Sequence, residues 1–215
     1  PIFDFDKIAL LKTLKDDLNS AVIGQEKAID SLYEMTKKIR FGCNSLRPVS
    51  FLFVGGTGVG KTYLAKEYTK ICYGLDHFIR LDMSEYKESH SISKLIGSPP
   101  GYVGYEDNRN VFEEIKDHPY AVLLLYEIEK ASLNVVHLFL QILDEGKAKN
   151  AKGEEIRFDN TVIIMTSNLG SEKDNVGFVN EENSKKEEEL RLFFGSEFLN
   201  RINKVIYFNN INEEA

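Results

Sequence analysis

Residues Gly55 to Thr62 follow the pattern Gly-x-x-x-x-Gly-Lys-Thr, which is typical of a loop that binds the phosphates of a nucleotide. Glycines in such a loop let backbone N–H groups converge on phosphate oxygens, and the following helix directs the positive end of its dipole at them. Lys61 is expected to reach the β- and γ-phosphates, and the Thr62 hydroxyl to coordinate Mg²⁺. The alternative is a plain glycine turn between a strand and a helix.

The bound base is predicted to be adenine. A GTPase would carry an Asn-Lys-x-Asp motif that reads guanine, but Asn203-Lys204 is followed by Val205-Ile206. ATP and Mg²⁺ are therefore the expected cofactors. The candidate ATP-binding residues of the loop are Gly55, Gly56, Thr57, Gly58, Val59, Gly60, Lys61 and Thr62.

A second motif follows the apolar run from Ala121 to Leu125, which ends in Tyr126-Glu127. In phosphate-loop ATPases such a strand normally ends in Asp-Glu, where Asp holds the magnesium shell and Glu polarises the attacking water. Glu127 is thus a candidate catalytic residue, although a carboxylate at a helix start would also be favoured by the helix dipole. Because the phenol of Tyr126 is neutral at pH 7, we hypothesise that ATP binds but hydrolysis is slow.

Strands must position these motifs, and the apolar pattern predicts strands at 49–54, 78–81, 121–125, 161–165 and 204–208. Helical spacing is predicted at 8–18, 26–40, 61–71, 132–143 and 187–194. Residues 171–186 are polar and charged, so they are predicted to form a mobile loop. Alternating strands and helices indicate an α/β fold with a mostly parallel sheet.

Composition limits the class of protein. The 215 residues suffice for one sizeable domain, and 42% hydrophobic with 28% charged residues is ordinary for a globular protein. The net charge of -7 argues weakly against a nucleic-acid scaffold, which usually carries a basic face. Two cysteines without Cys-x-x-Cys spacing argue against a zinc site or a disulfide framework.

Seven motifs in order make the chain resemble the second ATPase module of the Clp unfoldases, which are AAA+ proteins. They are Val22-Ile23-Gly24-Gln25, the phosphate loop, Leu81-Asp82-Met83-Ser84-Glu85-Tyr86, Pro99-Pro100-Gly101-Tyr102-Val103-Gly104, Glu127-Ile128-Glu129-Lys130-Ala131, Met165-Thr166-Ser167-Asn168 and Glu197-Phe198-Leu199-Asn200-Arg201. The resemblance covers nearly the whole chain. It implies a three-layer αβα AAA+ fold, a homo-hexamer and unfolded polypeptide substrates.

The resemblance also implies roles for single residues. Val22 and Ile23 would line the adenine pocket, and Asn168 matches a catalytic sensor that helps to position the water. Arg201 matches an arginine finger that reaches the γ-phosphate of the neighbouring subunit, where it would neutralise transition-state charge. By spacing alone, Arg201 could equally be a surface arginine in an ion pair.

Tyr102 and Val103 match the loop with which the family grips its polypeptide substrate in the central pore. An aromatic side chain between Gly101 and Gly104 offers apolar contact without sequence demands. The alternative is a tyrosine in the core, which the two glycines disfavour.

The tripeptide Val176, Gly177 and Phe178 resembles the element with which ClpA, ClpC and ClpX dock onto the peptidase ClpP and which ClpB lacks. The alternative is an aromatic that packs on its own domain. The short spacing from Phe178 to Arg201 favours ClpA over ClpC.

The whole of 1–215 is expected to be the AAA+ large subdomain, with 1–45 as its N-terminal helical lead-in. The small helical subdomain, the N-terminal domain and the first ATPase module of the family are expected to lie outside the chain. The resemblance favours the bacterial cytoplasm, with an organelle as the alternative. Besides ClpP, adaptor proteins are expected partners, whereas nucleic acids and membranes are not.

The leading function is therefore an ATP-driven motor module that threads substrates into ClpP. The alternatives are a hydrolysis-impaired module with a structural or regulatory role in the ring, a ClpB-like disaggregase module, or a nucleic-acid motor. The net charge and the Tyr102 loop disfavour the last of these.

Overall fold

The computed structural model describes residues 5–41, 46–98, 110–170 and 179–210. A five-stranded sheet lies at its centre, with the strand order β2-β3-β6-β1-β7, and every neighbouring pair is parallel. The strands are β1 (Val49–Val54), β2 (Phe78–Asp82), β3 (Val122–Tyr126), β6 (Val162–Ser167) and β7 (Lys204–Tyr207). The prediction of a parallel α/β fold is confirmed, and all five predicted strands are present.

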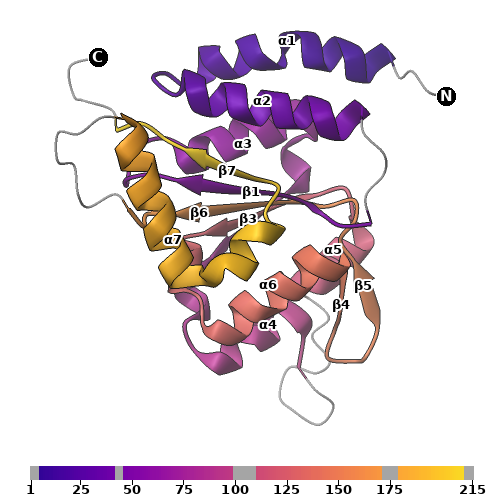
Figure 1. Cartoon of the computed structure of the whole chain (residues 1–215). Helices are drawn as coiled ribbons and strands as arrows, with labels where there is room; N and C mark the ends of the chain where they lie inside the picture. Colours follow the sequence, from indigo (N-terminus) through magenta and orange to yellow (C-terminus); the bar gives the residue numbers. More distant parts are fainter. Residues whose placement is uncertain (1–4, 42–45, 99–109, 171–178, 211–215) are drawn as a thin grey trace.

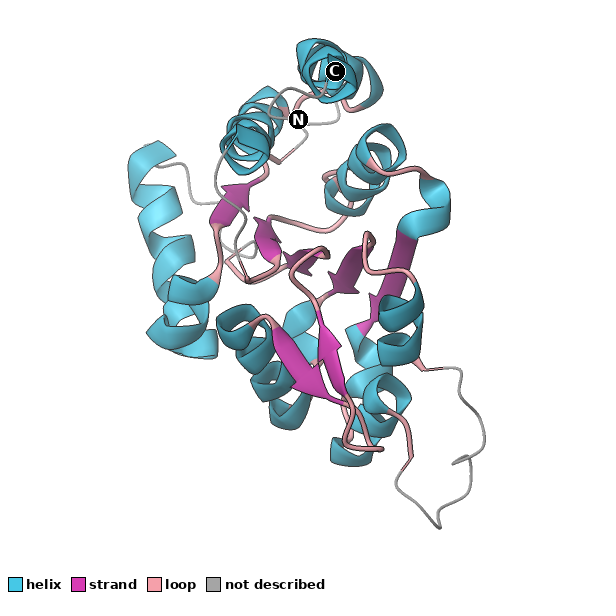
Figure 2. Cartoon of the chain, turned by 90° about the vertical axis from the view of Figure 1, so that its right-hand side faces the viewer, coloured by secondary structure: helices cyan, strands magenta, loops and turns pink. Residues whose placement is uncertain are grey.

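Helices cover both faces of the sheet, so the molecule has three layers (Figures 1 and 2). One face is covered by α2 (Glu26–Phe41) and α3 (Lys61–Cys72), with α1 (Phe5–Ala21) lying on these two helices, and the other by α5 (Val111–Asp117), α6 (Leu133–Glu145) and α7 (Val179–Arg201). Successive residues of each strand enter opposite core clusters, as in β3, where Leu123 faces α6 and Leu124 faces α3. Because helices cover both faces of the sheet, its central strands are apolar at successive positions and do not alternate with polar residues.

The helix α1 shows how helical spacing produces the first layer. Leu11, Leu14 and Leu18 recur at intervals of three and four residues and are all buried, on a helix that packs against α2 and α3. Burying one such leucine stabilises the fold by about 1.5–3 kcal/mol. None of the helices in the described ranges is both long enough and apolar enough to cross a lipid bilayer.

The helix α7 differs from the sequence prediction, because it already begins at Val179, within the predicted loop of 171–186. Its first half is rich in charged residues and lacks an apolar stripe, so periodicity does not reveal it. Ion pairs four residues apart, such as Arg191 with Glu187 at 2.7 Å, support the helix instead. Gly195, with φ 78°, interrupts the helical backbone before the segment that carries Arg201.

Smaller elements also went unpredicted. The chain forms the hairpin of β4 (Lys147–Lys149) and β5 (Glu155–Arg157) directly after α6, which Gly146 ends with φ 73°. The remaining short helices are η1 (Leu75–His77), η2 (Met83–Tyr86), η3 (Ser89–Ile92), α4 (Ser93–Ile96) and η4 (Ile128–Lys130). Segments of three or four residues are too short to show a period.

Parallel strands bring their carboxyl ends to one edge of the sheet. The phosphate loop follows β1, Tyr126 ends β3, and Asn168 follows β6, while Asp82 pairs in register with Tyr126. Open parallel sheets bind ligands at this edge. The fold therefore gathers the sequence motifs at one place.

Candidate functional site

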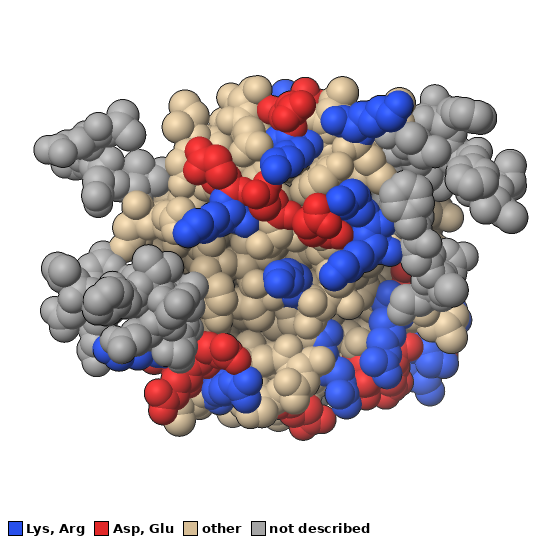
Figure 3. All heavy atoms as spheres, turned by 45° about the horizontal axis from the view of Figure 1, so that its top comes forward, with Lys and Arg blue, Asp and Glu red and all other residues tan. Residues whose placement is uncertain are grey.

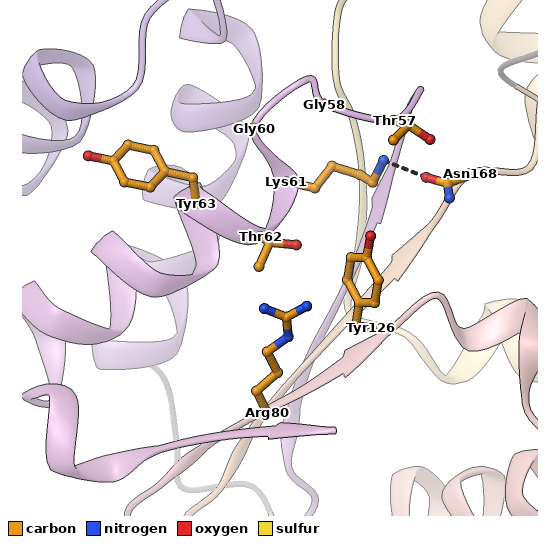
Figure 4. Close-up of a pocket in the computed structure, with 9 residues that line it drawn as sticks. All are labelled: Thr57, Gly58, Gly60, Lys61, Thr62, Tyr63, Arg80, Tyr126 and Asn168. Carbon is orange, nitrogen blue, oxygen red and sulfur yellow. Dashed lines mark hydrogen bonds between the residues drawn. The ribbon is translucent and has the colours of Figure 1, made fainter. Parts of the chain in front are cut away.

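A pocket of about 420 Å³ opens at the carboxyl ends of the strands. Figure 4 shows its lining: Thr57, Gly58, Gly60, Lys61, Thr62, Tyr63, Arg80, Tyr126 and Asn168. Lys61 and Asn168 meet on one side, Thr62, Arg80 and Tyr126 converge on a shared space, and Tyr63 points away (Figure 4). The structure thus brings the two sequence motifs together around one cavity.

Backbone conformation and close packing explain glycines of the phosphate loop, as Gly60 and Gly55 show. Gly60 is the N-cap of α3 with φ 98°, a conformation that residues with a Cβ rarely adopt. A Cβ on Gly55 would lie 2.9 Å from the Cβ of Phe208, so this residue, directly after β7, leaves no room for a side chain there. The loop is therefore shaped by both its own glycines and its neighbours.

Lys61 folds back onto its own loop. Its Nζ donates hydrogen bonds to the carbonyls of Gly55 and Gly56, both at 2.6 Å, and to Oδ1 of Asn168 at 2.8 Å. Burial lowers the pKa of Lys61 to about 8, against the effect of Glu129 and Glu127. A phosphate group would replace these three acceptors with a stronger, charged one.

Glu127 is held by residues from three directions. Its carboxylate accepts a hydrogen bond from Nδ2 of Asn168 at 2.7 Å and forms an ion pair with Lys130, while its N–H donates to Thr166. The hydrogen bond from Lys130 is the main reason why the pKa of Glu127 is lowered, so the group is ionised at neutral pH. Among the described residues it is the one non-glycine with positive φ (57°), a strain that concentrates at functional sites.

Asn168 links the two motifs. Its side chain accepts from Lys61 and donates to Glu127, and its backbone N–H donates to Glu129 at 2.9 Å. The sequence did not predict this contact of Glu129, because its only distinguishing feature there is its place two residues after Glu127. One amide therefore connects the predicted phosphate-binding lysine with the predicted catalytic carboxylate.

Tyr126 lies where the sequence motif would have Asp. The guanidinium of Arg80 lies 4.8 Å from the centre of its ring, in the range of a cation–π contact. Burial is the first cause that raises the pKa of Tyr126, so the phenol is neutral at pH 7. Sequence reasoning missed Arg80, although it directly precedes the quoted motif that begins at Leu81.

The described residues do not fit the protein side of a magnesium site. Thr62 supplies one hydroxyl, but none of the nine lining residues is Asp or Glu. The described ranges also contain no group of three or more His, Cys, Asp and Glu that could hold a metal ion. Magnesium is usually held through one or two carboxylates in addition to phosphates. The predicted role of Thr62 therefore lacks its usual partner.

The turn between α1 and α2 reaches the phosphate loop through Gln25. Its buried side chain donates to the Val59 carbonyl at 3.0 Å and to the Asn209 carbonyl at 2.8 Å, and accepts from Asn209 N–H at 2.9 Å. Gln25 belongs to the first family motif, Val22-Ile23-Gly24-Gln25, but residue type and spacing predict no role for it. Val22 is buried beside Gly60, whereas Ile23 is 77% exposed, and neither lines the pocket.

Arg201 lies at the end of α7 and does not line this pocket. Its Nε is 2.8 Å from Oδ1 of Asp144, which Arg47 also contacts at 3.2 Å. At 34% exposure, the Arg201 side chain remains partly accessible to solvent. The ion pair expected under the alternative is therefore present, while action on another subunit stays a prediction.

Two predicted sites lie outside the described residues. Tyr102 and Val103 belong to 99–109, and Val176, Gly177 and Phe178 belong to 171–178. The substrate loop and the peptidase-docking tripeptide therefore remain predictions from sequence.

Comparisons with known proteins give the family. A family model described as AAA domain (Cdc48 subfamily) matches residues 47–205. The chain is 44% identical over 218 residues to the ATP-dependent Clp protease ATP-binding subunit ClpE of Bacillus subtilis, with 97% of the chain and 31% of that protein covered. It is 45% identical over 217 residues to the chaperone protein ClpB of Aquifex aeolicus, with 94% and 22% covered.

A solved structure agrees with these relatives. The chain matches an Hsp104 subunit in a closed-state cryo-EM reconstruction with ATPγS and FITC-casein at a TM-score of 0.90 and 35% identity, covering 100% of this chain and 38% of that one. The chain thus spans less than half the length of the proteins it matches. From the matched family model and the shared three-layer fold, the chain belongs to the AAA domain family, with Clp and Hsp104 proteins as its relatives.

Proposed function

We propose that the chain is the ATP-binding large subdomain of an AAA+ motor module that acts on unfolded polypeptide within a hexamer. The observation that carries this proposal is the network in which Asn168 joins Lys61 and Glu127 at the mouth of the strand-end pocket. Phosphate-binding and water-activating groups must share one site in such a motor. The Hsp104 structure, which holds ATPγS and casein, supports the same class of ligand and substrate.

In this proposal Lys61 moves from its loop carbonyls to the phosphates, and backbone N–H groups of the loop complete the cradle. Asn168 then keeps Glu127 oriented toward the position of an attacking water. The ionised state of Glu127 suits a group that accepts a hydrogen bond from that water. Arg201 is proposed to approach the phosphates of a neighbouring subunit after exchanging its ion pair with Asp144.

We further propose that hydrolysis is slow because of Tyr126. A neutral phenol with a raised pKa offers no carboxylate at the end of β3, and its ring takes up space beside Thr62. A binding module with a structural or regulatory role in the ring is therefore the second candidate function. The observation that favours it is the absence of acidic residues from the pocket lining.

The proposed peptidase partner is ClpP, bound through Val176, Gly177 and Phe178. The ClpE and ClpB relatives are equally similar, at 44% and 45% identity, so a ClpB-like disaggregase stays an alternative. The earlier preference for ClpA, the substrate loop at Tyr102 and placement in the bacterial cytoplasm also stay predictions. A nucleic-acid motor is disfavoured, because both signs of charge are interspersed on the face that carries α1 and α2 (Figure 3).

Deleting 176–178 from the assembled protein tests the ClpP proposal. Degradation of a tagged substrate with ClpP should be lost, because an apolar anchor supplies much of such docking energy. ATP binding should be unchanged in the same variant. Degradation at the original rate would remove ClpP docking from the proposal and leave the ATP-binding module intact.

A further inference from the structure

The pocket has a cationic wall opposite the phosphate loop, and Arg80 forms it. The register of β2 and β3 pairs Asp82 with Tyr126, so Arg80 and Tyr126 are diagonal neighbours on the face that α3 covers. The guanidinium rests 4.8 Å from the Tyr126 ring centre and points toward Thr62 (Figure 4). No Asp or Glu in the described part of the chain forms an ion pair with Arg80.

The nearby carboxylates are committed elsewhere. Asp82 accepts the N–H of Ser84 at 2.9 Å, and Glu127 is bound by Lys130 and Asn168. Glu129, which acts on the charge of Lys61, accepts the N–H of Asn168, and none of these three carboxylates lines the pocket. The cavity therefore presents two cations, Lys61 and Arg80, together with the hydroxyls of Thr57 and Thr62, and no acid. Such a lining attracts an anion and repels a divalent cation.

We propose that Arg80 is a direct ligand of the nucleotide phosphates and that, with Tyr126 beside it, it makes nucleotide binding by this chain independent of a divalent cation. The proposal rests on the proposed function, because it concerns the same pocket. A guanidinium presents several donors in one plane, which match two phosphate oxygens at once. The Tyr126 ring lies 4.8 Å from the guanidinium carbon and, through this cation–π contact, holds it toward Thr62.

Tyrosine matters here because of what an aspartate would do at the same position. A carboxylate at 126 would pair with Arg80, withdraw it from the phosphates and attract Mg²⁺ to Thr62. The neutral phenol does neither. Residue 126 therefore decides whether a metal ion or Arg80 neutralises the phosphates.

The test is a titration of the chain with a fluorescent ATP analogue, in excess EDTA and again in magnesium chloride. We expect the dissociation constants of the natural chain to agree within about twofold, and those of Tyr126→Asp to differ by about tenfold or more in favour of magnesium. Arg80→Gln should weaken binding in EDTA by about tenfold. Arg157→Gln, at an exposed position of β5, is the matched control and should bind as the natural chain does.

Circular dichroism establishes that each variant is folded. If Arg80→Gln unfolds, Arg80→Lys replaces it, because lysine keeps the positive charge but lacks the planar guanidinium. Tenfold weaker binding of the natural chain in EDTA would overturn the inference and leave the proposed function standing. Equal affinity of the natural chain and the folded Arg80 variant for the ATP analogue in EDTA would also overturn the inference. If the natural chain binds no nucleotide in either buffer, the proposed function fails and this inference with it.

Discussion

Two sides of the pocket, the edge formed by the loop after β1 and the edge formed by the segment after β3, differ in how completely they carry the residues expected of an ATPase. The edge after β1 has the complete phosphate loop, with Gly60 in its left-handed turn and Lys61 at the start of α3. The edge after β3 has Glu127, whose carboxylate accepts a hydrogen bond from Asn168, but Tyr126 stands in place of the expected carboxylate. The two edges lie on neighbouring parts of one sheet, so their difference comes from residue type and not from distortion of the fold.

The comparison indicates that binding and hydrolysis can be separated within one site. The backbone of the loop and Lys61 form the phosphate cradle, and neither of them includes or contacts residue 126 in the hydrogen bonds described above. Hydrolysis depends on a metal ion and a polarised water, which the edge after β3 must help to hold.

The largest effect is expected from Lys61→Ala. Removing the ammonium should weaken ATP binding by about 100-fold or more, because a charge-assisted contact in a largely buried site is lost. Isothermal titration calorimetry measures the change, and Lys66→Ala, on the exposed side of α3, is the control. Binding within about threefold of the natural chain would show that the loop is not the phosphate site.

The charge of Lys61 predicts a dependence on pH. ATP binding needs the ammonium, so affinity should fall as pH rises through about 8, by up to about tenfold per unit. Stability should change in the opposite direction. The unfolded chain holds this proton up to its ordinary pKa of 10.5, so the free energy of unfolding should rise between pH 8 and 10.5.

Calorimetric titrations and urea unfolding across this pH window measure both trends in one preparation. An affinity that stays constant as pH rises through 8 would contradict the account of a buried lysine in contact with phosphate. Since the stability change comes from the free chain, it should appear without nucleotide.

A smaller effect on ATP binding is expected from Asn168→Ala, which removes the side chain that links Lys61 to Glu127. The variant loses the hydrogen bonds to Lys61 and Glu127, each worth about 1–2 kcal/mol of stability because one partner is charged. Nucleotide binding should weaken by only about threefold, since Lys61 keeps its charge and its position on α3. Asn134→Ala, at an exposed site on α6, controls for the loss of an amide.

Urea unfolding of these two variants measures the loss of stability, and nucleotide titration measures the loss of affinity. A loss of affinity as large as that of Lys61→Ala would break the comparison, because the two edges would then act as one unit.

Much of the fold follows from the sequence because strands that are buried on both faces must be apolar. The runs around Leu52, Leu124 and Ile164 stand out for this reason, and the phosphate loop has few residue choices at its turns. The start of α7 and the hairpin after Gly146 do not follow, since charged helices and three-residue strands lack a strong period.

The site was predicted in its parts but not in its connections. Lys61, Glu127 and Asn168 were each identified, yet their joining through one amide depends on strands more than 30 residues apart in sequence. Arg80 and Gln25 were missed as contributors because their partners, Tyr126 and Asn209, come close to them only in the folded chain. Such contacts depend on register, which residue spacing alone does not supply.

The central claim is that this site binds ATP but lacks a residue for efficient hydrolysis. Steady-state ATP hydrolysis by the assembled protein in magnesium, with Tyr126 and with Tyr126→Asp, tests it most directly. The account predicts a rate about 100-fold higher with aspartate, and loss of that gain when Glu127→Gln is added. Equal rates with tyrosine and aspartate would contradict it.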